Sequence, residues 1–404
     1  MKRHKRKILA VSMIIIFIII AVFITNKKDE SFEVRYGITD RGVKQAIKNN
    51  YIQDVDISEE HDGIIVTADN IIIDGSRILI FYNIESNIHR DSYKYLSSVT
   101  YNIMDENGSE IPAILEIPDY NFNLDTKKKL YSHFDMILSP QIDIPSNIQL
   151  DINLKVATHS SKSNNKGYSN KSVELPYKWK MNIPIDKKIF DNKKRVYDLD
   201  KNIEIEGQKI IINKLTVYPT ASLLDISFDQ NNTMNILGLQ DFKLVSDGEE
   251  YNNGIDGVSS SIIDGYNRVL YYESDYFGND KEIYIKGSGI KVIDKSKADI
   301  IVDVENNKLL KSPDDNLELE EIDNYNDSYK IILKYTDKPF ALASIFTDAD
   351  GTIFDFENVA HNLREDYIRI IYQISNDVKF VNPITLKVND YPTMINKIFK
   401  VDIN

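Results

Sequence analysis

The chain has no cysteine among its 404 residues. This absence excludes disulfide bonds, thiolate-ligated metal centres and cysteine nucleophiles together. An exported protein without disulfides fits a Gram-positive envelope better than an animal secretory route.

Histidine is scarce, and the familiar catalytic motifs are missing. No two histidines stand at i, i+4, and neither HExxH, G-x-S-x-G nor G-x-x-x-x-G-K-[ST] occurs. Ser163-Asn164-Asn165-Lys166 matches S-x-x-K, but it lies in a polar loop without SDN and KTG partners, which makes chance the better interpretation. We therefore predict no catalytic residue, no cofactor-binding residue, no cofactor and no enzymatic activity. The six histidines are His4, His61, His89, His133, His159 and His361.

Positive charge is also in short supply beyond the first residues. The chain has 49 Lys and Arg against 62 Asp and Glu, a formal net charge of −13. Five of the basic residues and none of the acids precede Ile8, so the remainder carries 44 positive and 62 negative charges. Such an acidic surface argues against nucleic acid as a partner.

One long apolar run is present, and it stands at the start. Residues 8–25 hold 18 uncharged, mostly apolar residues, which as a helix span about 27 Å and match the hydrocarbon core of a bilayer. Bulky side chains rather than small ones precede Thr25, so an uncleaved transmembrane helix is favoured over a cleaved signal peptide, which stays the alternative. The lipid bilayer is thus the first expected partner.

The flanking charges predict the orientation of this helix. Residues 1–7 form a basic tail, whereas Lys27 and Lys28 are offset by Asp29 and Glu30. The positive-inside rule then places the amino terminus in the cytoplasm and residues 26–404 outside the cell membrane.

The remaining chain is predicted to be mainly β. Short alternating or β-branched runs, such as Ile78–Glu85 and Tyr329–Tyr335, are separated by turn signals. The one short helix expected runs from Asp40 to Asn50, with Asp40 as its N-cap.

An internal repeat organises these strands into domains. Segments beginning at Gly63 and Gly207 share the order glycine, apolar strand, two-residue turn and second strand, at an offset of 144 residues. Repeats of this length are whole domains. We predict tandem immunoglobulin-like antiparallel β-sandwiches: a first domain at 26–186 with a short N-terminal helix, a second at 187–305, and a smaller third β domain at 316–404.

The nearest approach to a metal site is an acidic turn. Asp348, Asp350 and Asp355 are weak candidate ligands for a cation, but the loop lacks the length and the final glutamate of an EF-hand. A hairpin turn at Asp350-Gly351 explains the pattern as well. We therefore predict no metal.

The order of these features resembles a known family. Gly37, Gly42 and Gln45 of the expected helix, the double strand from Gly63, the MDENGSEI hairpin and the closing Trp179–Asp186 segment are similar to the Gram-positive membrane family of domain of unknown function 4179. The second repeat resembles the immunoglobulin-like module that often follows it. The resemblance implies an anti-sigma-like ectodomain linked to extracytoplasmic-function sigma factors. The seven residues before the apolar run are too few for a sigma-binding domain, so no direct sigma-factor contact is expected.

The sequence thus predicts a single-pass membrane protein whose sandwich modules bind or sense at the cell envelope. Its possible partners are an envelope protein or a wall polymer. A carboxylate-based envelope glycan hydrolase, a structural spacer or adhesin, and a sigma-factor regulator acting through a membrane partner stay open as alternatives.

Overall fold

The computed structural model describes most of the chain after residue 30. The predicted basic tail at 1–7, the predicted membrane helix at 8–25, three of the histidines (His4, His89 and His159) and the S-x-x-K match lie outside the described residues. Within the described part, no helix is long and apolar enough to cross a membrane. The described residues are 31–86, 95–115, 119–124, 129–138, 142–157, 172–255, 258–279, 281–325, 328–337, 340–375 and 377–404.

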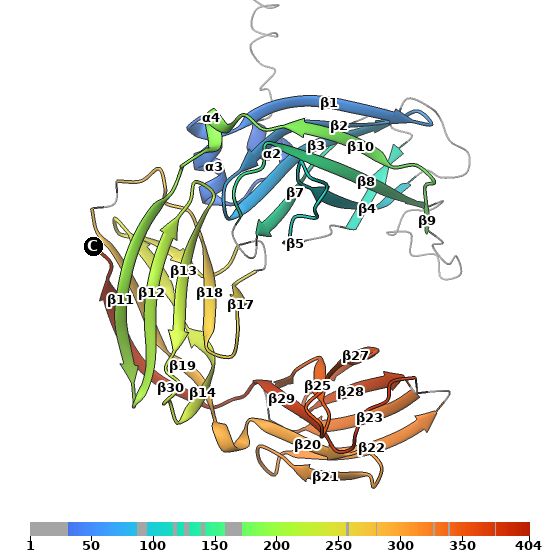
Figure 1. Ribbon diagram of the computed structural model, residues 1–404, viewed down its shortest axis with the longest axis vertical. Helices are drawn as coiled ribbons and strands as arrows, with labels where there is room; N and C mark the ends of the chain where they lie inside the picture. Colours follow the sequence, from blue (N-terminus) through green and yellow to red (C-terminus); the bar gives the residue numbers. More distant parts are fainter. Residues whose placement is uncertain are drawn as a thin grey trace, which may run out of the picture. The chain divides into compact units, whose positions relative to one another are not determined.

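The chain divides into two compact units, residues 1–191 and residues 192–404, and each is considered by itself. Both are built of antiparallel sheets (Figure 1). The prediction of a mainly β protein is confirmed.

The first unit contains two sheets, which we call the first sheet pair. One sheet has the order β1-β2-β3-β7-β5 and the other the order β10-β8-β4-β6, with β9 beside β8. The strands are β1 Gln53–His61, β2 Ile64–Ile73, β3 Arg77–Ser86, β4 Tyr95–Met104, β5 Ala113–Leu115, β6 Asp119–Asn123, β7 Leu130–Leu138, β8 Asn147–Ala157, β9 Ser172–Glu174 and β10 Trp179–Pro184.

These two sheets share one hydrophobic core. Burial alternates along β8, as the period-2 pattern of a strand with one covered face requires. The indole of Trp179 on β10 is fully buried and donates to the Ile64 carbonyl oxygen on β2 at 3.2 Å. Phe134 on β7 lies with its ring centroid 3.9 Å from that of Tyr101 on β4. Aromatic side chains therefore join one sheet to the other.

Among the residues from 31 onward, two short helices precede the first strand. They are α2 (Phe32–Tyr36) and α3 (Arg41–Lys48), and a third, α4 (Lys187–Phe190), closes the unit. The predicted helix is confirmed as α3, because the Asp40 carboxylate accepts the Val43 N–H at 2.8 Å in the expected N-cap geometry. The sequence analysis did not find α2, which ends at Gly37 in the left-handed conformation (φ 71°).

The second unit begins with a sheet pair built on the same plan, the second sheet pair. Its sheets have the orders β11-β12-β13-β18-β17 and β14-β19-β15-β16, with β30 beside β19, and both contribute to a single core. The strands are β11 Arg195–Ile205, β12 Gln208–Val217, β13 Ala221–Phe228, β14 Met234–Gln240, β15 Lys243–Ser246, β16 Glu249–Asn252, β17 Ser260–Ile262, β18 Asn267–Glu273, β19 Ile283–Asp294 and β30 Met394–Asp402.

A third sheet pair follows the short 3₁₀ helix η2 (Lys295–Lys297). Its sheets have the orders β21-β20-β29-β25-β26, with β24 beside β29, and β22-β23-β28-β27. They enclose a core of their own. The strands are β20 Asp299–Asp303, β21 Lys308–Lys311, β22 Leu317–Tyr325, β23 Ser328–Tyr335, β24 Ala341–Leu342, β25 Ile345–Thr347, β26 Ile353–Asp355, β27 Asn358–Leu363, β28 Ile368–Ser375 and β29 Ile384–Asp390.

The third sheet pair is inserted into the second. Strand β30 returns from the third sheet pair to lie beside β19 (Figure 1), with Met394 opposite Lys291 and Asp402 opposite Tyr284. In the first unit, β10 lies antiparallel beside β8 in the same way, but a connection of 21 residues links these two strands. The insertion therefore occupies the loop that corresponds to the β8–β10 connection.

This topology differs from the domain boundaries expected from the sequence. Residues 299–303 were assigned to the second domain but form a strand of the third sheet pair, and residues 394–402 were assigned to the third domain but complete the second. Strand order along the chain cannot reveal such a return, because the pairing joins segments about one hundred residues apart.

Candidate functional site

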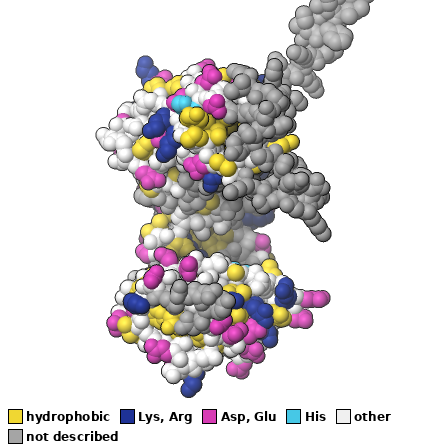
Figure 2. All heavy atoms as spheres, turned by 90° about the vertical axis from the view of Figure 1, so that its right-hand side faces the viewer, with side chains coloured by type: hydrophobic (Ala, Val, Ile, Leu, Met, Phe, Trp, Pro, Cys, Tyr) yellow, Lys and Arg dark blue, Asp and Glu magenta, His cyan; other side chains and the backbone are white. Residues whose placement is uncertain are grey.

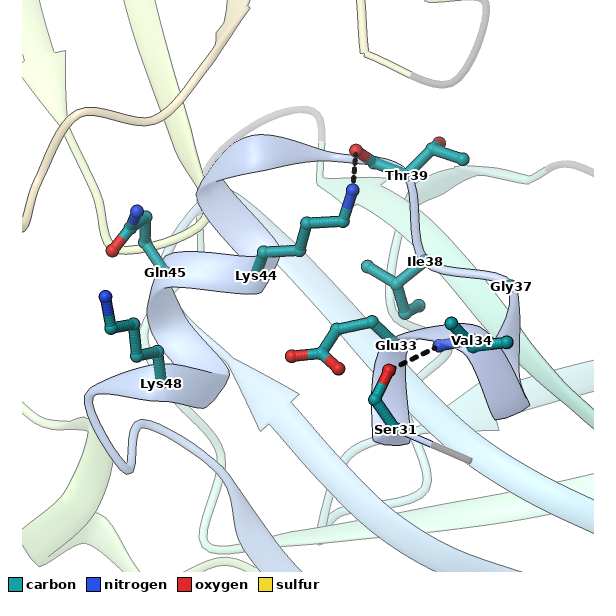
Figure 3. A pocket seen from close by; sticks show the side chains of 9 residues that line it. All are labelled: Ser31, Glu33, Val34, Gly37, Ile38, Thr39, Lys44, Gln45 and Lys48. Atoms are coloured by element: carbon teal, nitrogen blue, oxygen red, sulfur yellow. Dashed lines mark hydrogen bonds between the residues drawn. The ribbon is translucent and has the colours of Figure 1, made fainter. Parts of the chain in front are cut away.

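A cavity of about 590 Å³ lies between α2 and α3 of the first unit. We call α2, α3 and the turn between them the cap, and this cavity the cap cavity. Its lining comes from α2, from α3 and from the turn between them, with Glu33 extending from α2 toward the side of α3 that carries Lys44 (Figure 3). A volume of this size is in the range of small-molecule sites. The lining residues are Ser31, Glu33, Val34, Gly37, Ile38, Thr39, Lys44, Gln45 and Lys48.

Both charge signs and an apolar surface meet in the cap cavity. Lys44 and Lys48 are exposed on α3, and the Lys44 ammonium donates to the Thr39 carbonyl oxygen at 2.9 Å. Val34 exposes 64% of its surface and adds an apolar side chain to the lining. The arrangement suits a ligand or partner segment that carries an apolar part and an anionic group.

A buried ion triad holds α3 against the first sheet pair. Arg77, on β3, has no exposed surface. Its guanidinium donates to Asp40 at 2.8 Å and, through Nε, to Asp135 on β7 at 2.7 Å, with a further bond from Nη2 to Asp135. Because a buried charge is stable only when it is paired, the two carboxylates and the guanidinium require one another. The N-cap of α3 is thereby fixed to two strands.

A second polar cluster fixes α2. The Tyr36 hydroxyl donates to Asp69 at 2.7 Å, and the Asn83 amide donates to the two oxygens of the same carboxylate at 2.7 and 2.9 Å. Burial, followed by the bond to Asp69, raises the pKa of Tyr36 far above its usual range, so that this hydroxyl stays a donor. Nδ1 of His133 lies 2.9 Å from the Tyr36 carbonyl oxygen. Both helices of the cap are thus tied to the sheet beneath them.

Of the three weak candidate metal ligands, Asp348 and Asp350 lie in one turn and Asp355 does not. The Asp348 carboxylate accepts the backbone N–H groups of Asp350, Thr352 and Val381 at 3.0, 2.9 and 3.1 Å. The Val381 bond is the largest cause that lowers the pKa of Asp348. Asp355 is exposed on β26. Among the residues described, no three His, Cys, Asp or Glu side chains are grouped to hold a metal ion.

The three histidines within the described ranges lie apart in the fold. His61 ends β1, where Nε2 lies 2.8 Å from the Glu59 carboxylate and the ring stacks on Tyr177. His133 is on β7, and His361 is on β27 in the other unit.

Asp40 was predicted from the sequence as a helix N-cap, but its partners Arg77 and Asp135 were not. Arg77 stands between Ser76 and the apolar run Ile78–Tyr82, and a lone charge at the start of a buried strand is the signal that indicates a buried ion pair. Asp135 lies in the similar apolar strand Leu130–Leu138.

The fold and the cap define a class: a multi-module antiparallel β protein whose first module carries a fixed pair of N-terminal helices. Within this class, residues 1–86 match the family described as "Domain of unknown function (DUF4179)", and residues 194–333 match the "Family of unknown function (DUF5643)". The expected resemblance is thereby confirmed for the start of the chain, and the second match falls on the second sheet pair and the beginning of the third.

Comparison with solved structures and curated proteins adds little. A structure titled "The crystal structure of the conserved domain protein from Bacillus anthracis" aligns over 88% of this chain and 90% of its own, with 13% identity and a TM-score of 0.38. No curated protein matches the chain.

Proposed function

We propose that the protein is a single-pass cell-membrane protein that binds or senses a partner at the outer face of the membrane, without catalysis. Residues 8–25 form its membrane helix, residues 1–7 lie in the cytoplasm, and the sheet pairs are immunoglobulin-like β-sandwiches facing the cell envelope. The similarity of residues 1–86 to DUF4179 covers the proposed helix and the cap together.

The single observation that carries this proposal is the position of the cap cavity in the chain, close after the apolar run at 8–25. Ser31, the first residue that lines the cap cavity, is six positions beyond Thr25. Six residues span about 20 Å at most when fully extended. If residues 8–25 cross the bilayer, the cap cavity opens within that distance of the membrane surface.

The chemistry of the cap suits this position. Lys44 and Lys48 offer two ammonium groups to lipid headgroups, to an anionic wall polymer or to acidic groups of an envelope protein. The Arg77 triad and the Tyr36 cluster bond both helices to β2, β3 and β7. A ligand that moves the helices therefore also moves these strands, and not only a loop.

The proposal includes a link to sigma-factor regulation through a membrane partner. The acidic balance of 62 Asp and Glu against 49 Lys and Arg supports a partner other than nucleic acid.

Burial raises the pKa of five tyrosines among the described residues, and none of the five lines the cap cavity. These tyrosines are Tyr36, Tyr272, Tyr335, Tyr372 and Tyr391.

Protease accessibility tests the topology. Intact protoplasts that express the full chain with a carboxy-terminal tag are treated with a protease that cannot cross the membrane. The proposal expects the tag to be lost from intact protoplasts. A tag that is protected until the cells are lysed contradicts it.

Charge reversal in the cap tests the binding role. Lys44→Glu with Lys48→Glu is compared with Lys297→Glu, an exposed lysine of η2 in the other unit. Photo-crosslinking from position 45 in membranes should give an adduct that the double variant reduces and the Lys297 variant retains. Equal adducts in all three proteins contradict a role for the cap.

A further inference from the structure

A second cavity, of about 340 Å³, lies in the second unit where the third sheet pair is inserted. We call it the junction cavity. Its walls come from β13, β14 and the connection between them, from the β17–β18 hairpin, from η2 and the residue that follows it, and from β29. The second sheet pair, the crossing segment and the third sheet pair thus all contribute. A volume of this size accommodates a small molecule.

Arg268 on β18 is the principal charge of this cavity. Its guanidinium lies over the Phe228 ring at 4.9 Å from the centroid, and it donates to the carbonyl oxygens of Ile236 at 3.1 Å and Leu237 at 3.2 Å. Both acceptors are neutral. Burial is the cause that lowers the pKa of Arg268, and within the described chain no carboxylate lies at ion-pair distance from it. A guanidinium has five N–H donors, so donors remain after these two bonds.

Two lysines extend the positive wall. The Lys295 ammonium donates to the Gln230 carbonyl oxygen at 2.8 Å, and Lys387 pairs with Asp299. Both line the junction cavity, from η2 and from β29. Three cations on three elements therefore surround one volume.

The carboxylates of the cavity wall are engaged in their own turns. Asp264 accepts the backbone N–H groups of Tyr266 at 2.7 Å and Asn267 at 2.9 Å. Asp229 accepts the backbone N–H of Asn231 at 2.8 Å, and Lys209 lies 3.8 Å away. After the Asn231 bond, Lys295 is among the charges that lower the pKa of Asp229, and Lys387 pairs with Asp299. Among the described residues neither wall acid forms an ion pair with Arg268, so this guanidinium is the wall cation that has no carboxylate partner.

We propose that the junction cavity binds the phosphate group of a small molecule, with Arg268 as the main contact and Lys295 and Lys387 as auxiliary contacts. A guanidinium presents paired N–H donors that match two phosphate oxygens. Two additional ammonium groups favour phosphate, with nearly two negative charges, over a carboxylate with one. This site is independent of the proposed membrane function, because it uses residues of the second unit alone.

The position of the site gives binding a structural consequence. The third sheet pair connects to the second through two chain crossings, at η2 and at the Asp390–Met394 segment, and Lys291 bonds to Asp390 at 2.5 Å beside the second crossing. A phosphate held by Arg268 and Lys387 links a strand of each sheet pair. Binding therefore stabilises their junction.

Calorimetric titration of the full-length protein in detergent tests the proposal with three phosphate probes and one carboxylate. Inorganic phosphate represents the free ion, sn-glycerol 3-phosphate a soluble phosphomonoester, and short-chain phosphatidic acid a lipid headgroup that is also a phosphomonoester. Acetate is the carboxylate probe. We expect saturable binding of at least one phosphate probe, tighter than that of acetate, and the preferred probe identifies the source.

Variants locate the site. Arg268→Gln should weaken phosphate binding about tenfold or more, as expected for loss of a charge-assisted pair of hydrogen bonds. Lys295→Gln and Lys387→Gln have side chains outside the cores, so they test the site even if the arginine variant does not fold, and each should weaken binding about threefold. Arg369→Gln, which removes a half-buried arginine of β28 paired with Glu320, is the matched control and should bind as the parent does.

Two results overturn the proposal. One is the absence of saturable binding by every phosphate probe at millimolar concentration. The other is phosphate binding whose affinity is unchanged in Lys295→Gln, in Lys387→Gln and in a folded Arg268→Gln. Acetate binding as tight as phosphate binding overturns the proposal in the same way. Either result leaves the protease experiment on topology unaffected.

Discussion

The guanidinium of Arg77 donates to the carboxylate of Asp40 at 2.8 Å, and their side chains expose only 1% and 8% of their surfaces. Asp40 uses its other oxygen to cap α3 through the Val43 N–H. One carboxylate therefore both starts the helix and fixes it to the sheet. Since the proposed function depends on a firmly held cap, this contact is its structural basis.

Removal of the Arg77 charge should destabilise the first unit strongly. Arg77→Met keeps much of the side-chain volume but leaves Asp40 and Asp135 buried without their cation, which costs about 3–5 kcal/mol of unfolding free energy. Urea unfolding at neutral pH, followed by the fluorescence of Trp179 in the core of this unit, measures the loss.

An arginine at the surface provides the comparison. Arg369 pairs with Glu320, and the two side chains expose 33% and 34% of their surfaces. Arg369→Met should change the unfolding free energy of the second unit by less than about 1 kcal/mol, as surface ion pairs do. Because Trp179 lies in the first unit, circular dichroism follows the unfolding of this variant. Similar losses for the two variants contradict a special role of the Arg77 triad.

Strand β30 should stabilise the second sheet pair rather than the third. Ile403 lies in the core of the second sheet pair and exposes 6% of its surface, so Ile403→Ala should cost about 2–4 kcal/mol. Ile403 directly follows β30, whereas Ile398 lies on β30 itself and exposes 87%, so Ile398→Ala should cost less than about 0.5 kcal/mol. Hydrogen exchange should show lost protection in β19 and β12 for the first variant; loss confined to β23 and β28 would contradict the insertion.

The insertion itself should be dispensable for the second sheet pair. The Val292 N–H donates to the Thr393 carbonyl oxygen at 3.0 Å, so the two ends of the insertion are adjacent. Replacement of residues 295–392 by a four-residue Gly/Ser turn should leave a folded second sheet pair with a cooperative thermal transition. A chain that fails to fold after this replacement, while the parent folds, argues against the insertion.

The stability that Asp348 gives to the acidic turn should depend on pH and not on added calcium. The pKa of Asp348 is lowered in the folded protein, so its contribution to stability is present above the unfolded value of about 4 and is lost as the pH falls through the lowered value. Asp348→Asn should therefore lower the melting temperature at pH 7, and the gap to the parent should narrow toward pH 3. Asp350→Asn, in the same turn but exposed, is the control. Two results together contradict this interpretation: added calcium raises the melting temperature of the parent, and the difference in melting temperature between the parent and Asp348→Asn does not depend on pH.

Local patterns in the sequence predicted much of the fold. Asp40 indicated the start of α3, and the expected hairpin around Gly108 and turn at Asp350-Gly351 each place their glycine at positive φ. Such features depend on residues close together in the chain, whose backbone preferences are decided locally.

The remaining features depend on contacts between distant residues. The segment at 305–324 is rich in acidic residues, yet it contains β21 and most of β22. Leu317 and Leu319 of β22 pack on the core of the third sheet pair, while the glutamates are exposed. The pairing of β30 with β19 and the approach of Arg268 to Ile236 are likewise set by tertiary packing. No local pattern specifies them.

The surface gives a practical route to the central question of topology. Acidic and basic side chains lie interspersed with apolar ones on the face shown in Figure 2, so exposed positions are easy to choose without disturbing a core. Since the chain has no cysteine, a single introduced cysteine is the only thiol.

Labelling of such cysteines with a membrane-impermeant maleimide tests the central claim most directly. Asn107→Cys in an exposed turn of the first unit, Asp350→Cys in an exposed turn of the second, and Lys2→Cys before the apolar run are compared in intact protoplasts. The account predicts that the first two react in intact cells and that the third reacts only after permeabilisation. Labelling at position 2 in intact cells, with positions 107 and 350 protected, would contradict it.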